Sequence, residues 1–496
     1  MPRKNPPPPK TTQKRRGREI EITPENIQLT HEEGVNGERV SLRQKMTTNT
    51  FQSTVNITTR RKDVLPVWSG KQSGRPKKQP VVLAAIIDDE EDDDGHLGAV
   101  NDFDPCLEGP SRPTTAMTVH MDDEDDLPFY MANLTLGSDS SPFDQLLHVV
   151  GQTEPKKWTQ FPRGTFTATN VKKLGEGAYG EVYATVMKGR RVAIKIVPIE
   201  ADEAKPLFNG QYNGGKMPSC ALVLPEVVVL KELSKLNNPT SNNSTPNFIT
   251  VVDCYMVRGK YPTGLTKAWD MYADMKESLN DRPAGYSTDK QLYIAFVTAN
   301  GGSDLESFIV STENEVRSIL CQLMLSLIVA ENELEFEHRD LHLGNVLIEK
   351  VEKTDKLEYK LNANPISINS FGIKTNIIDF TLSRIKKDGT TVFFNLENDE
   401  EIFEGQNDLQ FDVYRRMRFN NNRNWQDFHP TTNLYWIEYL ANKLIEEPIC
   451  PKNLLTPKRR KELKTIFKQL GRFRRCSETL QDANFYDKFY AGIIEK

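Results

Sequence analysis

Two polar residues five positions apart, Asp340 and Asn345, are of the types that phosphoryl transfer needs. An aspartate can accept the proton of an attacking hydroxyl group, and an asparagine can hold a Mg²⁺ ion that neutralises the phosphates. His338 and Arg339 precede Asp340, and this arrangement matches a catalytic loop for such a reaction. A short charged loop can also arise by chance, so the interpretation depends on further motifs in the expected order.

A glycine-rich segment upstream of this loop, residues 175–182, predicts a binding site for the phosphates of a nucleotide. It is followed by an apolar strand that ends in a lysine, residues 192–195. In protein kinases, glycines let the turn approach phosphate oxygens and the lysine binds the α- and β-phosphates. Taken singly, such glycines also form ordinary hairpin turns, and such a lysine usually faces solvent. Their order favours a nucleotide site that contains Gly175, Glu176, Gly177, Gly180, Val182, Ala193 and Lys195.

The predicted lysine needs a carboxylate partner on a neighbouring helix. Residues 225–233 carry apolar side chains at helical spacing, with Pro225 at the predicted start of the helix. We expect Glu226 to pair with Lys195, because the alternative, Glu232, lies among charged residues that indicate a solvated face. The 24 residues 201–224 are too long for an ordinary connection and indicate an insertion.

The adenine end of the site is predicted around a buried strand, residues 292–298, which is apolar throughout. Thr298 would lie at the back of the adenine pocket. Ala299 and Gly301 belong to the expected hinge between two lobes, whose backbone groups would bind the adenine edge. Asp304 lies where its carboxylate would reach the ribose or a basic substrate.

A second metal-binding carboxylate is predicted at Asp379. Short strands at residues 346–348 and 375–378 form an expected pair that leads to it, and Asp379 would hold the Mg²⁺ ion that bridges the phosphates. Thr381 stands where protein kinases carry glycine. A β-branched residue lacks the freedom of glycine at positive φ, so this segment should switch less readily between active and inactive forms. Residues 350–374 form a polar insertion, and no Ala-Pro-Glu follows.

These motifs predict an α+β, bilobal protein-kinase-like fold over residues 165–490. Residues 165–300 would form a small antiparallel β lobe with one main helix, and residues 301–490 a larger, mostly helical lobe. Residues 1–160 lack sustained periodicity and contain basic and acidic blocks, which predicts a disordered tail. Its basic clusters fit nuclear import or contact with DNA, and residues 74–77 resemble an AT-hook core, but a solvated basic tail is the alternative.

Composition and length argue against several other classes of protein. The chain has 496 residues, of which 37% are hydrophobic and 27% charged, as for a domain with a long polar extension. Six cysteines without a CxxC pair argue against a disulfide framework or a zinc site. No apolar run long enough for a bilayer and no secretory signal are visible, so we expect a soluble intracellular protein. A basic amphipathic helix at residues 458–475 would contact DNA or an acidic partner, or dock its apolar stripe on the domain.

The departures from ordinary protein kinases resemble the haspin family of atypical eukaryotic protein kinases. Haspins carry His-Arg-Asp-Leu-His-x-Gly-Asn, which residues 338–345 match, with His342 where most kinases have lysine. They carry Asp-Tyr-Thr followed by Leu-Ser-Arg, which residues 379–384 match closely, and they lack Ala-Pro-Glu. The resemblance covers roughly residues 165–490. Further similar stretches lie at residues 224–226, 267–270, 280–283, 410–415 and 429–430.

The resemblance implies a serine/threonine kinase that uses ATP and Mg²⁺ to phosphorylate a threonine near the N-terminus of histone H3 in mitotic chromatin. It implies a monomer in the nucleus and on chromosomes, with no membrane association and no need for activation-loop phosphorylation. By resemblance, Asp412 would brace the backbone of the catalytic loop. An acidic cleft suits basic residues beside the target threonine, although solvated acidic loops are the alternative. The expected substrate-binding residues are Asp304, Glu306, Asp399 and Glu401.

Two other functions remain open. A pseudokinase would use the same fold as a scaffold, but Lys195, Glu226, Asp340, Asn345 and Asp379 all retain the types that catalysis needs. An active kinase with a different substrate is the second alternative, because the hinge differs from the family pattern. A small-molecule kinase is disfavoured, since that group does not share this glycine loop.

Overall fold

The computed structural model describes residues 140–177, 179–201, 210, 212–276, 278–406 and 408–495, and every structural statement below refers to these residues. The predicted tail, with its basic clusters, its acidic blocks and the AT-hook-like residues 74–77, lies outside them up to residue 139. Residues 140–160, which we assigned to the tail, instead form an ordered part of the domain. They contain α3 (Pro142–Val149), β1 (Lys156–Lys157) and the short helix η2 (Trp158–Gln160).

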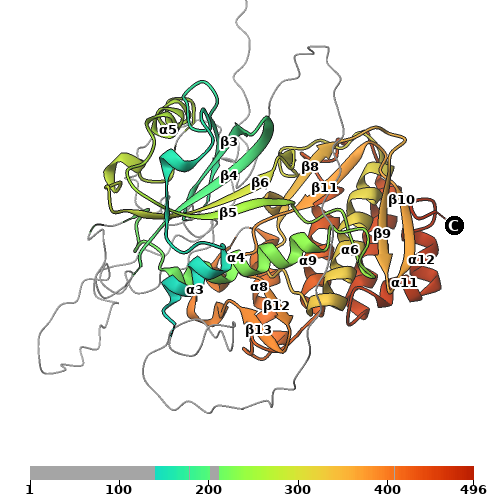
Figure 1. The fold of residues 1–496 in the computed structure, drawn as a ribbon. Coiled ribbons are helices and arrows are strands. Elements are labelled where there is room, and N and C mark those ends of the chain that lie inside the picture. Colours follow the sequence, from blue (N-terminus) through green and yellow to red (C-terminus); the bar gives the residue numbers. More distant parts are fainter. Residues whose placement is uncertain are drawn as a thin grey trace, which may run out of the picture. The chain divides into compact units, whose positions relative to one another are not determined.

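The N-terminal lobe is built on a sheet of six described strands in the order β1-β5-β6-β4-β3-β2 (Figure 1). Neighbouring strands are antiparallel, except that β1 pairs with β5 in parallel. The predicted buried strand is β6, and its continuous apolar sequence is explained by its central place between β5 and β4. Besides β1, the strands are β2 (Lys172–Glu176), β3 (Glu181–Met187), β4 (Arg190–Ile199), β5 (Val251–Arg258) and β6 (Leu292–Ala299).

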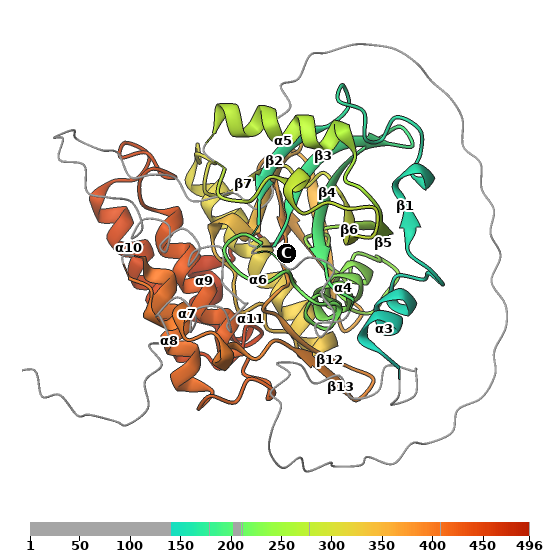
Figure 2. The same cartoon turned by 90° about the vertical axis from the view of Figure 1, so that its left-hand side faces the viewer.

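Two helices pack together along one side of this sheet, α3 and α4 (Cys220–Lys235), while α5 (Thr263–Met275) lies on the other side (Figures 1 and 2). The predicted start of α4 at Pro225 is wrong, because the helix begins five residues earlier and contains the proline. Pro225 is the sixth residue of the helix, so its missing N–H group removes the intrahelical hydrogen bond that residue 225 would otherwise donate to the carbonyl group of Ala221.

The C-terminal lobe is mostly helical, as predicted, and its helices α7 to α10 gather on the side away from α3 and α4 (Figure 2). Its central helix, α6 (Glu313–Leu334), begins at Thr312, whose side chain accepts a hydrogen bond from the backbone N–H of Glu315. The other helices of this lobe are α7 (Glu401–Glu404), α8 (Leu409–Asn420), α9 (Thr431–Leu444), α10 (Pro457–Phe467), α11 (Glu478–Gln481) and α12 (Ala483–Phe489).

Small strand pairs carry the catalytic segments. The predicted pairing of residues 346–348 with residues 375–378 is present, because β8 and β11 are antiparallel with Ile348 opposite Thr375. The polar insertion before β11 forms the hairpin of β9 and β10. The strands of this lobe are β7 (Ser303–Asp304), β8 (Val346–Lys350), β9 (Lys356–Leu361), β10 (Asn364–Asn369), β11 (Ile373–Ile377), β12 (Arg384–Lys387) and β13 (Thr390–Phe393).

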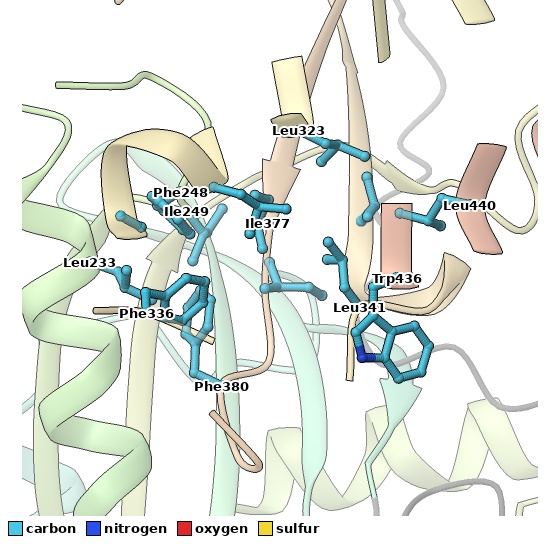
Figure 3. Close-up of a cluster of buried hydrophobic side chains, with 14 of the residues drawn as sticks. Leu233, Phe248, Ile249, Leu323, Phe336, Leu341, Ile377, Phe380, Trp436 and Leu440 are labelled. Carbon is cyan, nitrogen blue, oxygen red and sulfur yellow. The ribbon is translucent and has the colours of Figure 1, made fainter. Parts of the chain in front are cut away.

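An aromatic cluster in the core joins the two lobes behind the catalytic segments (Figure 3). Phe380 lies 6.1 Å from Phe248 and 6.3 Å from Phe336 between ring centroids, and all three rings are buried. Figure 3 shows this group beside Leu233 of α4. The segment that contains Phe380 is therefore anchored in the core next to the helix that carries Glu226.

The basic C-terminal helix docks its apolar stripe on the domain. Leu463, Ile466 and Phe467 of α10 are buried, and Arg459 pairs with Glu313 of α6 at 2.6 Å.

Within the described ranges, no helix is both long enough and apolar enough to pass through a lipid bilayer. The sheet lobe with α4 and the mostly helical second lobe confirm the predicted α+β, bilobal protein-kinase-like fold.

Candidate active site

A lysine and two carboxylates meet where the lobes face each other. Nζ of Lys195, on β4, lies 2.7 Å from Oε1 of Glu226 on α4 and 3.6 Å from Oδ2 of Asp379. Burial disfavours the charged lysine, but attraction to Asp379 and Glu226 outweighs it and raises the pKa of Lys195. Burial raises the pKa of Glu226, whereas Lys195 and hydrogen bonds from Thr381 hold the pKa of Asp379 below its usual range despite burial. The alternative partner Glu232 instead pairs with Lys235.

A mostly apolar cavity opens beside this ion-pair group. Thr298, the residue predicted at the back of the adenine pocket, is one of its lining residues, whereas Ala299 and Gly301 follow at the hinge. A Cβ atom on Gly301 would come within 2.7 Å of Cδ1 of Leu347 and 2.9 Å of Cδ1 of Ile249, so any other residue would require these two side chains to shift. The cavity is lined by Lys195, Glu226, Leu230, Ile249, Phe296, Thr298, Ile378, Asp379 and Phe380.

The catalytic loop is held from several sides. Arg339 is fully buried, donates to the carbonyl group of Trp425 at 2.6 Å and pairs with Glu337 at 3.2 Å. Ile378 donates its backbone N–H to the carbonyl of Asn345 at 3.1 Å, which ties this loop to the segment of Asp379. The loop therefore presents Asp340 and Asn345 beside the lysine and carboxylates of the cavity.

Asn345 has the features of a metal ligand. Its Nδ2 donates to the carbonyl oxygen of Asp340 at 2.8 Å, which orients the side chain. Its Oδ1 is buried and has no hydrogen-bond partner among the described residues. A buried polar atom without a partner is costly unless a ligand satisfies it, and an amide oxygen together with the Asp379 carboxylate is a donor set that Mg²⁺ prefers. These residues thus fit a bound magnesium ion.

The glycine loop is held by residues from a distant part of the chain. Asn280 donates from Nδ2 to the carbonyl oxygens of Gly177 at 3.1 Å and Gly180 at 3.4 Å. A Cβ atom on Gly180 would come within 2.4 Å of the carbonyl oxygen of Ile196, so this position requires glycine. Sequence reasoning gave Asn280 no role, and the only signal was its place in a stretch similar to the family.

Glu176 does not line the cavity with its side chain. Its carboxylate is buried, pairs with Lys173 at 2.6 Å and accepts a hydrogen bond from the backbone N–H of Leu279 at 2.8 Å. Any contact of Glu176 with a nucleotide must therefore come from its backbone. Gly175, Val182 and Ala193 lie in the strands β2, β3 and β4, close to the glycine turn and Lys195.

The four predicted substrate carboxylates lie at the rim of the catalytic loop and in the segment before α8. Asp304 is 1% exposed and accepts hydrogen bonds from the N–H and hydroxyl groups of Ser307, so it stabilises its own turn. Burial raises the pKa of Glu306, although the nearby His342 opposes the shift. Asp399 is buried just before α7, and Glu401 lies in the first turn of that helix. Their contacts with ribose or substrate stay predictions.

The prediction that Asp412 braces the catalytic loop is wrong. Its side chain is 66% exposed and pairs with Arg415 on its own helix. Asn433 of α9 braces the loop instead, because its Oδ1 accepts the N–H of His338 at 3.1 Å and its Nδ2 donates to the carbonyl of Phe336 at 2.9 Å. Asp412 is exposed because α8 turns the face with Phe411 and Tyr414 toward the core.

Comparisons with known proteins agree with this geometry. The family model of the haspin-like kinase domain, which describes the sequences of that family, matches residues 142–487 of this chain. The chain is 41% identical to the serine/threonine-protein kinase haspin of Bos taurus, over 61% of this chain and 37% of that protein. It is 34% identical to the serine/threonine-protein kinase haspin homolog of Drosophila melanogaster, over 64% of this chain and 56% of that protein. It is 32% identical to the haspin homolog of Arabidopsis thaliana, over 76% of this chain and 61% of that protein.

The chain thus spans less than two thirds of the length of each of these relatives. The match nevertheless covers both lobes, from α3 to α12, and includes the catalytic loop, the Lys195 strand and the Asp379 segment. The resemblance inferred from the sequence motifs is therefore confirmed, and the chain belongs to the haspin-like kinase family.

Proposed function

We propose that this chain is an active serine/threonine kinase that transfers the γ-phosphoryl group of ATP to a threonine in a basic protein tail. The observation that carries the proposal is the convergence of Lys195, Glu226 and Asp379 beside a catalytic loop whose Asn345 oxygen lacks a partner among the described residues. A buried amide oxygen without a donor is costly, and a bound metal ion would satisfy it.

Each residue has a distinct proposed role. Lys195, held by Glu226, would bind phosphate oxygens of ATP, with the glycine loop above them. Asp379 and Asn345 would hold Mg²⁺, which when bound neutralises the phosphate charges. Asp340 would orient the acceptor hydroxyl group and accept its proton. The nucleotide base would enter the cavity beside Thr298, with Ala299 and Gly301 at its hinge side.

The proposed acceptor is a threonine near the N-terminus of histone H3, flanked by basic residues. Asp304, Glu306, Asp399 and Glu401 would provide negative charge for such a substrate. The names of the relatives support a protein substrate. With this acceptor, we further propose action in the nucleus and on mitotic chromosomes as a monomer, with basic segments of residues 1–139 as possible contacts for chromatin or DNA.

The test compares an H3-tail peptide with the same peptide carrying alanine at the target threonine, each incubated with the full chain and Mg-ATP. Transfer to the first peptide alone is expected. Nucleotide binding without transfer to any protein would favour the scaffold, and transfer only to other proteins would favour a different substrate. Asp340→Asn should abolish transfer while nucleotide affinity stays nearly unchanged, and retained turnover in that variant would contradict the role of Asp340.

A further inference from the structure

A tyrosine from the C-terminal lobe contacts the catalytic aspartate directly. Tyr414 lies on α8, its side chain is fully buried, and its hydroxyl group donates a short hydrogen bond to Oδ1 of Asp340. The Tyr414 ring packs edge-on against Trp436 of α9, with 5.3 Å between ring centroids. Packing by α9 therefore fixes where the hydroxyl group can point.

The other carboxylate oxygen of Asp340 has a different environment. Oδ2 lies 3.4 Å from Nδ2 of Asn345 and 3.9 Å from Nε2 of His342, both at the limit of direct contact. The two oxygens are thus distinguished, because Oδ1 has a strong donor and Oδ2 has only weak neighbours. An acceptor hydroxyl group that approaches Asp340 would find Oδ2 available.

We propose that Tyr414 is a positioning residue for the catalytic base: it binds Oδ1 of Asp340 so that Oδ2 faces the acceptor hydroxyl group. This inference rests on the proposed function of Asp340. Little in the sequence points to this role, since Tyr414 occupies one more apolar position on the face of α8 that includes Phe411 and Met417.

The first test is the steady-state kinetics of transfer by Tyr414→Phe. Without the hydroxyl group Oδ1 of Asp340 loses its donor and the carboxylate can turn, so kcat should fall by about tenfold. KM for ATP and KM for the peptide should stay close to the wild-type values, because Tyr414 contacts neither substrate in this proposal. The matched control is Tyr490→Phe, which loses a buried hydroxyl contact with Thr479 at 2.7 Å and does not touch Asp340. A kcat equal to that of the wild type would overturn the proposal.

A second measurement does not depend on activity or on the stability of the phenylalanine variant. 3-Fluorotyrosine incorporated at position 414 keeps the hydroxyl group and reports on its hydrogen-bond partner through its ¹⁹F resonance. This resonance should move in Asp340→Asn, because the partner changes from a carboxylate to a neutral amide, and it should stay in place in Tyr490→Phe. A resonance that Asp340→Asn leaves in place would overturn the proposal. If the wild type transfers no phosphate, the proposed function fails, but this spectrum still decides whether the two residues are coupled.

Discussion

The hydroxyl group of Thr381 donates a 2.6 Å hydrogen bond to Oδ1 of Asp379, the carboxylate that also faces Lys195. Asp379 itself has φ of +60°, in the left-handed region that costs energy for a residue with a Cβ atom. Thr381 therefore stabilises an otherwise unfavourable conformation through its side chain. The residue that replaces the usual glycine does more than stiffen the backbone, because it also fixes the direction of the carboxylate.

Replacing Thr381 by valine should weaken the binding of the Mg²⁺ ion that transfer requires. Valine keeps the β-branch but removes the hydroxyl group, so the carboxylate of Asp379 would lose its orientation. Loss of such a supporting hydrogen bond typically lowers metal affinity by about 10-fold or more, and we expect a rise of that order in the Mg²⁺ concentration for half-maximal transfer. Thr381→Ser, which keeps the hydroxyl group, should remain close to the wild type. An unchanged Mg²⁺ titration for the valine variant would contradict this role.

Glu226→Gln should reduce transfer, whereas Glu232→Gln should not. Glu226 forms the 2.7 Å ion pair with Lys195, and Glu232 pairs only with Lys235 on its own helix. A hydrogen bond to a charged group contributes about 1.5–3 kcal/mol, so loss of the charge at Glu226 should lower kcat/KM by roughly 10- to 100-fold. Both variants should melt at temperatures near that of the wild type, which makes Glu232→Gln a control. Equal activity of the two variants would refute the pairing as a requirement.

Asn280→Ala should weaken nucleotide binding more than it slows transfer at saturating ATP. Asn280 donates to two carbonyl groups of the glycine loop, so its removal should let the loop move. We expect a several-fold loss of affinity for Mg-ADP and faster hydrogen exchange in residues 175–181. Asn364→Ala is the matched control, because Asn364 is exposed in β10 and its side chain donates to the carbonyl group of Asn362 in its own hairpin. Unchanged exchange in the glycine loop would exclude this function of Asn280.

Glu331 should make folding stability depend on pH. Burial raises the pKa of this carboxyl group from 4.5 to about 7, although hydrogen bonds from Asn433 and Cys476 oppose the shift. The folded state therefore binds this proton more tightly than the unfolded chain. Its contribution to stability is fully present below pH 4.5 and is lost as the pH rises through about 7, with an upper limit of roughly 3 kcal/mol.

The measurement is urea unfolding of the wild type and Glu331→Gln at pH 5.5 and pH 8. The glutamine variant cannot ionise, so relative to the wild type it should gain stability between the lower and the higher pH. Glu181, whose pKa burial also raises to about 7, and His338, whose pKa burial lowers to about 4, titrate in both proteins. Their effects cancel in the difference, and a difference that stays constant with pH would contradict the prediction.

Short motifs made the fold and much of the site predictable. The glycine loop, the lysine strand, the catalytic loop and the Asp379 segment are each encoded within about eight neighbouring residues. Their order along the chain defines two lobes, and the apolar runs of β6 and α6 predict buried elements whatever they pack against. The pairing of Lys195 with Glu226 followed from one further argument, that a buried lysine needs a carboxylate on an adjacent helix.

The amino-acid sequence by itself thus determined the family, the two-lobed fold and the residue types of the reaction, because these depend on local patterns. Only the tertiary structure decided which distant side chains support them: Tyr414 at Asp340, Asn280 at the glycine loop, and Asn433 instead of Asp412 at the catalytic loop. These contacts join residues 74 to 103 positions apart. An apolar pattern shows which face of a helix is buried, but the partner of a polar atom depends on how whole helices and strands pack in space.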